Sequence, residues 1–300
     1  MLKYTMVLNS NRSLPIRHIM LLLIALILFQ LQLPGKKEKQ HFDGPYVRWL
    51  NENRLICASI IRQKGENRIT KKVLDTAAFP AYVRSLPKAK LAYSLFVPEI
   101  SASQFKAKRV IAVGDIHGDY RNFRKLLINH GIIDKRLNWR SGQSHLVILG
   151  DVMNRGNKVT ECLWLIRKIE QQALKAGGRV HLLLGNHETM ILQGDQRFIA
   201  KKYRKIHRHG YSKHFSRYTE FGRWLRTKHV MIRINDTLFV HGGISPELID
   251  TGMNMDQINR RFRKAMDLDF PYSEPDNRIE ALYRILLGRN GPVWYRGYYK

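Results

Sequence analysis

Four short apolar runs between residues 109 and 241 alternate with polar segments, and each run ends at a glycine-containing loop. The runs are VIAV, HLVIL, VHLLL and TLFV, whose length and composition are typical of buried strands. Apolar residues at helical spacing follow the first two, in DYRNFRKLLINHG and from about Val159 to Ala176. Strands that alternate with helices predict a largely parallel sheet with helices on its faces.

Polar side chains of the kind that bind metals stand where these runs end, in GDIHG, GDVMNRG, GNHE and HGG. Asp115, Asp151 and Asn186 are 36 and 35 residues apart, which fits successive β-loop-α-β units of about 30 residues or more. Because ligands gather outside the carboxyl ends of parallel strands, we expect the loops to converge on one site.

The first 35 residues have the pattern of a signal peptide or signal anchor. Basic residues precede an apolar run from Ile19 to Leu33, which is shorter than the ~20 residues of a usual spanning helix. No small-residue cleavage site follows, so an uncleaved anchor is favoured over a cleaved signal, with a buried helix as the alternative. We expect a membrane-anchored or exported protein, with its domain on the periplasmic side.

The rest of the chain divides into a linker at residues 36–42, a β-rich N-terminal extension at 43–108 and a main domain at 109–300. Two runs of the extension are predicted to pair as a hairpin around QKGEN. Within the main domain, the segment around KKYRKIHRHG is strongly basic. This segment contains His207, His209 and His214. A solvated basic face near a substrate groove is favoured for them over a metal site.

The composition favours anionic partners without choosing among them. Lys and Arg number 52 against 24 Asp and Glu, for a net charge of +28, which suits phosphorylated protein, nucleotide, nucleic acid or an anionic membrane surface. A surface kept basic for solubility is the alternative. Cys57 and Cys162 are far apart in sequence, so no disulfide framework is expected. A metal site here would use histidine, carboxylate and amide.

The residue types in the four loops predict a dinuclear metal centre. The expected ligands are Asp115, His117, Asp151, Asn186 and His241. Asp151 can bridge, because a carboxylate has two oxygens, and the mixture of hard oxygens with imidazole suits manganese, iron or zinc. Two ions about 3.5–4 Å apart activate a shared water and clamp both oxygens of an in-line displacement. His187 is placed to act as general acid, and the planar fork of Arg155 suits phosphate.

These motifs resemble the calcineurin-like metallophosphoesterase superfamily, and within it the phosphoprotein-phosphatase type. GPVWYRG, together with DGPYV near the start of the extension, is similar to the bacterial and Shewanella-like branch. The resemblance implies an α/β fold, the four-layer αββα sandwich, with two divalent ions, manganese first among manganese, iron and zinc. It assigns the five ligands above to metal, His187 to the catalytic acid, and Arg155 and Arg296 to the phosphate clamp.

Two departures from the family pattern affect the expected activity. Asn154 stands where the family has an aspartate that partners the catalytic histidine. An amide carries no charge, so His187 should hold its proton less tightly, which predicts a slower reaction with a lower pH optimum. In addition, no histidine follows His241, whereas the family has a final metal-binding histidine beyond WYRG. We therefore expect an incomplete C-terminal part and a weakly held second metal.

The sequence thus predicts a metal-dependent phosphatase in which a metal-bound hydroxide attacks a phosphomonoester, with phosphorylated Ser, Thr or Tyr in protein as the substrate. Nucleic acid is not expected as the main partner. Two alternatives stay open: hydrolysis of a nucleotide such as a dinucleoside polyphosphate, and an impaired domain that only binds phosphorylated ligands.

Overall fold

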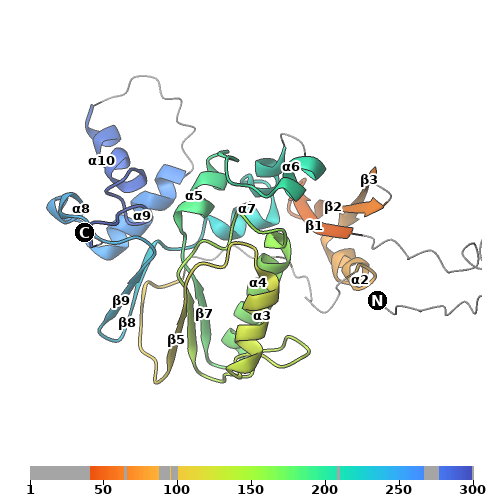
Figure 1. Cartoon of the computed structure of the whole chain (residues 1–300), viewed down its shortest axis with the longest axis horizontal. Coiled ribbons are helices and arrows are strands. Elements are labelled where there is room, and N and C mark those ends of the chain that lie inside the picture. The colour runs from red at the N-terminus through yellow and green to blue at the C-terminus, as the bar shows by residue number, and fades with distance from the viewer. Residues whose placement is uncertain are drawn as a thin grey trace, which may run out of the picture.

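The computed structural model describes residues 41–63, 66–87, 95, 101–207, 210–266 and 277–298. They form three three-stranded sheets with helices packed around them (Figure 1). The predicted signal segment at 1–35 lies outside these residues, as does almost all of the linker. In the part of the chain that is described, no helix has both the length and the apolar character needed to cross a membrane.

A parallel sheet carries the predicted loops at its carboxyl end. Its strands are β5 (Val110–Val113), β6 (His145–Ile148) and β7 (Arg179–Leu182), in the order β5-β6-β7. Two helices connect them, α3 (Tyr120–Asn129) and α4 (Val159–Lys175). Leu146 and Ile148 of the buried central strand β6 share one core with the apolar side of α4. The alternation of strands and helices predicted from the sequence is confirmed.

A second sheet packs against the opposite face of the first. It consists of β4 (Gln104–Phe105), β8 (Met231–Ile234) and β9 (Thr237–Val240), in the order β4-β8-β9. Val147 of β6 points away from α4 and packs with Leu183, Ile232 and Ile234, as the two-residue side-chain period of a strand requires. The two sheets therefore form a sandwich, and the predicted mixed α/β fold is confirmed.

The N-terminal extension is an antiparallel sheet of β1 (His41–Trp49), β2 (Arg54–Gln63) and β3 (Glu66–Asp75), followed by the short helices η1 (Thr76–Ala78) and α2 (Phe79–Arg84). Strands β2 and β3 pair along their whole length, from Arg54 opposite Asp75 to Gln63 opposite Glu66. This confirms the predicted hairpin. The domain boundaries themselves stay a prediction.

A buried polar network fastens the extension to the main domain. The Asp43 carboxylate of β1 accepts hydrogen bonds from Tyr46, Thr160 and Lys202, at 2.7, 3.2 and 3.0 Å, and its Oδ2 lies 3.1 Å from His207 Nε2. His207 Nδ1 lies 2.9 Å from His214 Nε2. Thr160 belongs to α4, so the network spans three separate parts of the chain.

The network corrects the interpretation of the basic segment. The His207 side chain is 3% exposed and His214 is mostly enclosed against the Tyr46 ring, 4.0 Å away between centroids. A solvated face was therefore wrong for these two histidines, because the N-terminal sheet covers them. His209 lies outside the described residues.

The remaining elements lie around the ends of the two sheets. They are α5 (Asn186–Leu192), α6 (Lys201–His207), η3 (Tyr211–Phe215), α7 (Glu220–Leu225), α8 (Pro246–Asp250), α9 (Met255–Met266) and α10 (Asn277–Leu287). Figure 1 shows α5 and α6 together at one end of the parallel sheet, with the N-terminal sheet beside α6.

Candidate metal centre

Three loops meet at the carboxyl end of the parallel sheet, and their backbones touch. The Asp151 carbonyl accepts hydrogen bonds from Ile116 and His117, and the His117 carbonyl accepts one from Gly156. A Cβ atom on Gly156 would lie 2.1 Å from the His117 carbonyl oxygen. One on Gly185 would lie 2.2 Å from Asp151 Oδ1, far inside any allowed contact. The glycines in GDVMNRG and GNHE are therefore needed for the loops to approach one another.

The loop backbone is strained where the predicted site residues stand. His117, Asp151, Asn154 and Arg155 all have positive φ, between 46° and 66°. For residues with a Cβ this region costs free energy of order 1–3 kcal/mol each, and such residues cluster at functional sites. Positive φ is thus found on the candidate ligands themselves as well as on neighbouring glycines such as Gly118 and Gly150.

The side chains of the predicted metal ligands converge around the Asp151 carboxylate. Oδ2 of Asp151 lies 3.6 Å from His117 Nε2, and Oδ1 lies 3.6 Å from His241 Nε2. Asp115 Oδ2 is 3.5 Å from His117 Nε2, and Asn186 Oδ1 is 2.9 Å from His241 Nε2. Asp151 thus presents one oxygen to each of two donor groups, which is the arrangement of a bridging carboxylate.

Hydrogen bonds to backbone carbonyls fix which nitrogen of each histidine is free to bind. His117 Nδ1 lies 2.9 Å from the Met153 carbonyl, and His241 Nδ1 lies 2.8 Å from the Leu149 carbonyl. A carbonyl can only accept, so both Nδ1 atoms carry hydrogen and both Nε2 lone pairs face the centre. The Nε2 of His117 is buried, and among the described residues it has no hydrogen-bond partner. A buried acceptor of this kind fits a metal ligand.

Glu188 is a positioning residue that sequence analysis missed. It is fully buried, and its two carboxylate oxygens accept hydrogen bonds from four backbone N–H groups at 2.7–2.9 Å, those of Asp151, Val152, Met153 and Gly185. Burial and the nearby Asp151 carboxylate raise the pKa of this carboxyl, and the hydrogen bonds from the Met153, Gly185 and Asp151 backbone oppose that rise. Because every neighbour is a donor, the geometry fits the ionised form. Its place in GNHE, at the third residue of α5, was the available signal.

The predicted general acid His187 lies between Asn154 and Arg155. Its Nδ1 is 2.8 Å from Asn154 Nδ2 and its Nε2 is 3.3 Å from an Arg155 nitrogen. Asn154 Oδ1 is buried and, within the described part of the chain, has no partner. Turning the amide over would let Oδ1 accept from His187 Nδ1–H and leave Nε2 to accept from Arg155, which satisfies all three groups.

Two donor groups share Asp151, and one of them includes His187. In each group, one ligand atom from every residue lies within 4.8 Å of the other two. The first group is His117, Asp151 and His187, and the second is Asp115, Asp151 and His241. His187 Nε2 is 3.8 Å from Asp151 Oδ2. The His187 ring therefore lies next to the candidate metal site and also next to Arg155. The residues predicted from the sequence are therefore brought together, while their individual roles stay predictions.

Arg296 reaches the site from the WYRG segment. One of its nitrogens lies 3.2 Å from His241 Nε2, and Gly242 N–H donates to the Pro292 carbonyl at 2.8 Å, which ties the two segments together. Arg155 and Arg296 thus approach the cluster from different loops, as a clamp on a phosphoryl group would require.

The electrostatics of the site reflect burial and crowded charges. Burial raises the pKa of Asp151 to about 6, and the nearby Asp115 carboxylate adds to that rise. Burial, with His117 and Arg155 beside it, lowers the pKa of His187 to about 4. Two carboxylates and several imidazoles close together have the charge pattern that bound cations would balance.

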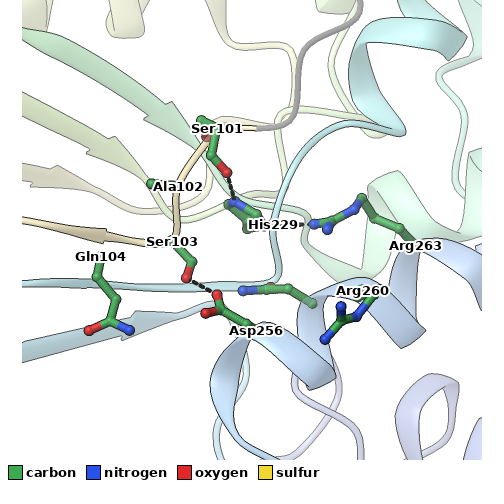
Figure 2. Close-up of a pocket in the computed structure, with 9 residues that line it drawn as sticks. Ser101, Ala102, Ser103, Gln104, His229, Asp256, Arg260 and Arg263 are labelled. Atoms are coloured by element: carbon green, nitrogen blue, oxygen red, sulfur yellow. Dashed lines mark hydrogen bonds between the residues drawn. The ribbon is translucent and has the colours of Figure 1, made fainter.

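One described cavity lies away from this centre. It has a volume of about 480 Å³ and lies between α9 and the start of β4, near His229, Arg260 and Arg263 (Figure 2). Figure 2 shows Arg263 directed at His229, 2.7 Å from its Nδ1, and Ser103 hydrogen-bonded to Asp256. It contains none of the predicted site residues.

Comparison with known proteins agrees with the geometry at the carboxyl end of the sheet. Residues 108–299 match the family model of the calcineurin-like phosphoesterases. The crystal structure of a cold-active protein-tyrosine phosphatase from a psychrophilic Shewanella species superposes with a TM-score of 0.75 and 35% identity, over 87% of this chain and 77% of that one.

Curated relatives include Shewanella-like protein phosphatase 2 of Arabidopsis thaliana, which is 32% identical over 42% of this chain and 35% of its own length. A symmetrical bis(5'-nucleosyl)-tetraphosphatase of Chromobacterium violaceum is 26% identical over 60% of this chain and 54% of its own length. The chain spans between about a third and somewhat over half of the first curated relatives that it matches.

Proposed function

Because this chain belongs to the calcineurin-like phosphoesterase family, we propose that it is a metal-dependent phosphatase that hydrolyses phosphomonoesters of protein side chains. The observation that carries the proposal is the position of Asp151, whose two oxygens face His117 on one side and His241 on the other at 3.6 Å. A carboxylate shared between two donor groups fits a pair of divalent ions.

The position of each residue in the site assigns it a role in the proposed reaction. Asp115, His117 and Asp151 would hold one ion, and Asp151, Asn186 and His241 the other. When bound, two divalent ions activate water and neutralise charge on the phosphoryl oxygens. Arg155 and Arg296 bind and orient the phosphate from two sides. In its protonated form, once Arg155 binds the phosphate instead, His187 would deliver a proton from Nε2 to the leaving oxygen.

Manganese is the metal that we propose. The expected ligands mix carboxylate and amide oxygen with imidazole and include no thiolate, which suits manganese among the first-row divalent ions, with iron and zinc as competitors. Elemental analysis of protein purified without added metal, together with reconstitution by each ion in turn, tests this choice.

Phosphoprotein is favoured over nucleotide as the substrate. The chain is similar to Shewanella-like protein phosphatases and to a protein-tyrosine phosphatase structure that aligns over most of its length. The tetraphosphatases are 26–28% identical to this chain, below the 32% of Shewanella-like protein phosphatase 2 and the 35% of the phosphatase structure. A domain that binds phosphorylated ligands with little turnover is the rival, because Asn154 offers His187 no negative charge.

The decisive experiment measures hydrolysis of para-nitrophenyl phosphate with added manganese, for the wild type and for Asp151→Asn. The variant keeps the side-chain shape and removes the shared charge, so we expect a loss of more than about 100-fold, together with loss of bound metal. Equal rates in the two proteins would refute the enzyme. Metal-dependent binding of phosphopeptide without turnover would support the rival.

From the leader alone we also propose membrane anchoring or export, with the domain on the periplasmic side and an anionic membrane surface as a possible contact. Cell fractionation, with protease treatment of intact and opened spheroplasts, tests this. Protection of the domain in spheroplasts and its cleavage only after lysis would contradict it.

A further inference from the structure

One flank of the candidate site is formed by a strongly basic stretch of the chain. Residues 196–219 contain eight Lys and Arg and no Asp or Glu. They include α6, where Lys201, Arg204 and Lys205 are exposed. A basic stretch of this kind is often only a solvated surface. Its position relative to His187 and Arg155 decides whether it has a further role.

The basic flank is joined directly to the loop that carries Arg155. The Arg155 backbone N–H donates to the Phe198 carbonyl at 2.9 Å. Lys202 Nζ donates to the Asn157 carbonyl at 2.9 Å and also to the buried Asp43 carboxylate. Tyr203, on the next position of α6, is fully buried. Helix α6 is therefore held at a fixed position beside the catalytic loop.

The Phe198 ring lies beside His187 and is partly open to solvent. It lies 5.4 Å from the His187 ring between centroids and is 47% exposed. A general acid must stand beside the atom that it protonates. If His187 is that acid, the part of the substrate attached to the leaving oxygen lies near Phe198, and α6 begins three residues further along the chain.

The cations of this flank differ in how far they are already paired. Lys202 forms an ion pair with Asp43. Arg197 forms one with Asp195, with 2.7 Å between a guanidinium nitrogen and a carboxylate oxygen. Lys201 and Lys205 are one helical turn apart, both exposed, and neither forms an ion pair with a described residue. They form a pair of unbalanced charges on one side of α6.

We propose that α6, through Lys201 and Lys205, recognises acidic residues that flank the phosphorylated residue of a protein substrate. The inference rests on the proposed phosphatase function and names the substrate class more closely. Exposed cations contribute mainly to the encounter and to selectivity between partners, so the preference should appear in kcat/KM and weaken as salt rises. Nucleic acid is the competing polyanion, and the experiment includes it.

The test uses two phosphopeptides with the same phosphorylated residue, one flanked by Asp and Glu and the other by Asn and Gln at the same positions. The measured quantity is the ratio of their kcat/KM values. For the wild type we expect a ratio above 1 at low salt. For Lys201→Gln/Lys205→Gln it should fall about 2- to 10-fold, the size expected for two exposed ion pairs.

The matched control is Lys135→Gln/Lys175→Gln. It removes the same charge from two exposed lysines, one in the loop after α3 and the other at the end of α4, away from the carboxyl ends of the strands. The control should keep the wild-type ratio. A ratio near 1 in the wild type, or an equal fall in both variants, overturns the inference.

Two further outcomes separate this inference from the proposed function. If the wild type does not hydrolyse para-nitrophenyl phosphate, the proposed phosphatase function is wrong. Normal turnover of that small ester with no peptide preference would contradict only the role of α6. If single-stranded DNA oligonucleotide competes with the acidic peptide better than an unphosphorylated acidic peptide of equal charge does, the flank serves nucleic acid and the inference is wrong.

Discussion

Glu188→Gln tests whether one buried carboxylate holds the metal-site loops in place. In the wild type its two oxygens accept from the backbone N–H groups of Asp151, Val152, Met153 and Gly185, two on each oxygen. A glutamine of the same shape has a single carbonyl oxygen. Its NH2 group would face two of the four donors, so two buried N–H groups lose their acceptor.

The expected loss of stability follows from the two N–H groups that lose their acceptor. A buried donor left without an acceptor costs about 1–3 kcal/mol, so two of them predict a loss of about 2–6 kcal/mol in the free energy of unfolding. Native proteins have only about 5–15 kcal/mol in total. The variant should therefore show a large fall in its urea midpoint, or fail to fold at 37 °C.

Equilibrium urea unfolding at pH 7, followed by tryptophan fluorescence, measures the difference. Glu247→Gln is the matched control, because Glu247 also stands in the first turn of a helix, α8, but is exposed. It should stay within about 0.5 kcal/mol of the wild type. If Glu188→Gln unfolds at the same midpoint as this control, the four hydrogen bonds do not stabilise the loops and the reasoning fails.

Three further predictions concern single side chains. Asn154→Asp places a carboxylate beside His187, so the pKa of that histidine should rise and the alkaline limb of the pH–rate profile should move upward; an unchanged profile would contradict this. Asp43→Asn leaves the buried His207 and Lys202 without their carboxylate, and about 3 kcal/mol or more should be lost at pH 7. Because hydrogen bonds hold the pKa of Asp43 well below its ordinary value despite burial, this difference should be complete above about pH 4 and shrink as the pH falls further. Phe198→Ala should lower kcat/KM for an aryl phosphate about 2- to 10-fold through the lost ring contact, with a smaller effect on an alkyl phosphate.

The sequence predicted that the candidate ligands lie together, because each follows a strand directly. Once the runs before Asp115, Asp151 and Asn186 are parallel neighbours, the loops after them must meet at one edge. That inference needs only local patterns and one rule of topology. It needs no cavity as a guide, and the cavity beside Arg263 contains none of these residues.

What the sequence could not predict depends on partners far along the chain. His207 looked solvated because its neighbours are Lys and Arg, yet Asp43, 164 positions away, buries it. Glu188 looked like an ordinary residue of α5, and only the fold shows four backbone donors turned toward it. Such roles are set by tertiary contacts, which local spacing does not encode.

The backbone at Asn154 makes the exchange of Asn for Asp an informative experiment. Its φ of 66° lies in the left-handed region, which asparagine and aspartate enter more readily than most other residues with a Cβ. Both side chains also have nearly the same shape, so either fits the same loop beside His187. Asn154→Asp should therefore leave the loop, and with it Asp151 and Arg155, in place, and alter only the charge at the Nδ1 side of the imidazole. A change in the pH–rate profile without a change in bound metal or in unfolding midpoint would locate the effect in proton transfer. A fall in bound metal would instead show that the amide is needed to keep the cluster assembled.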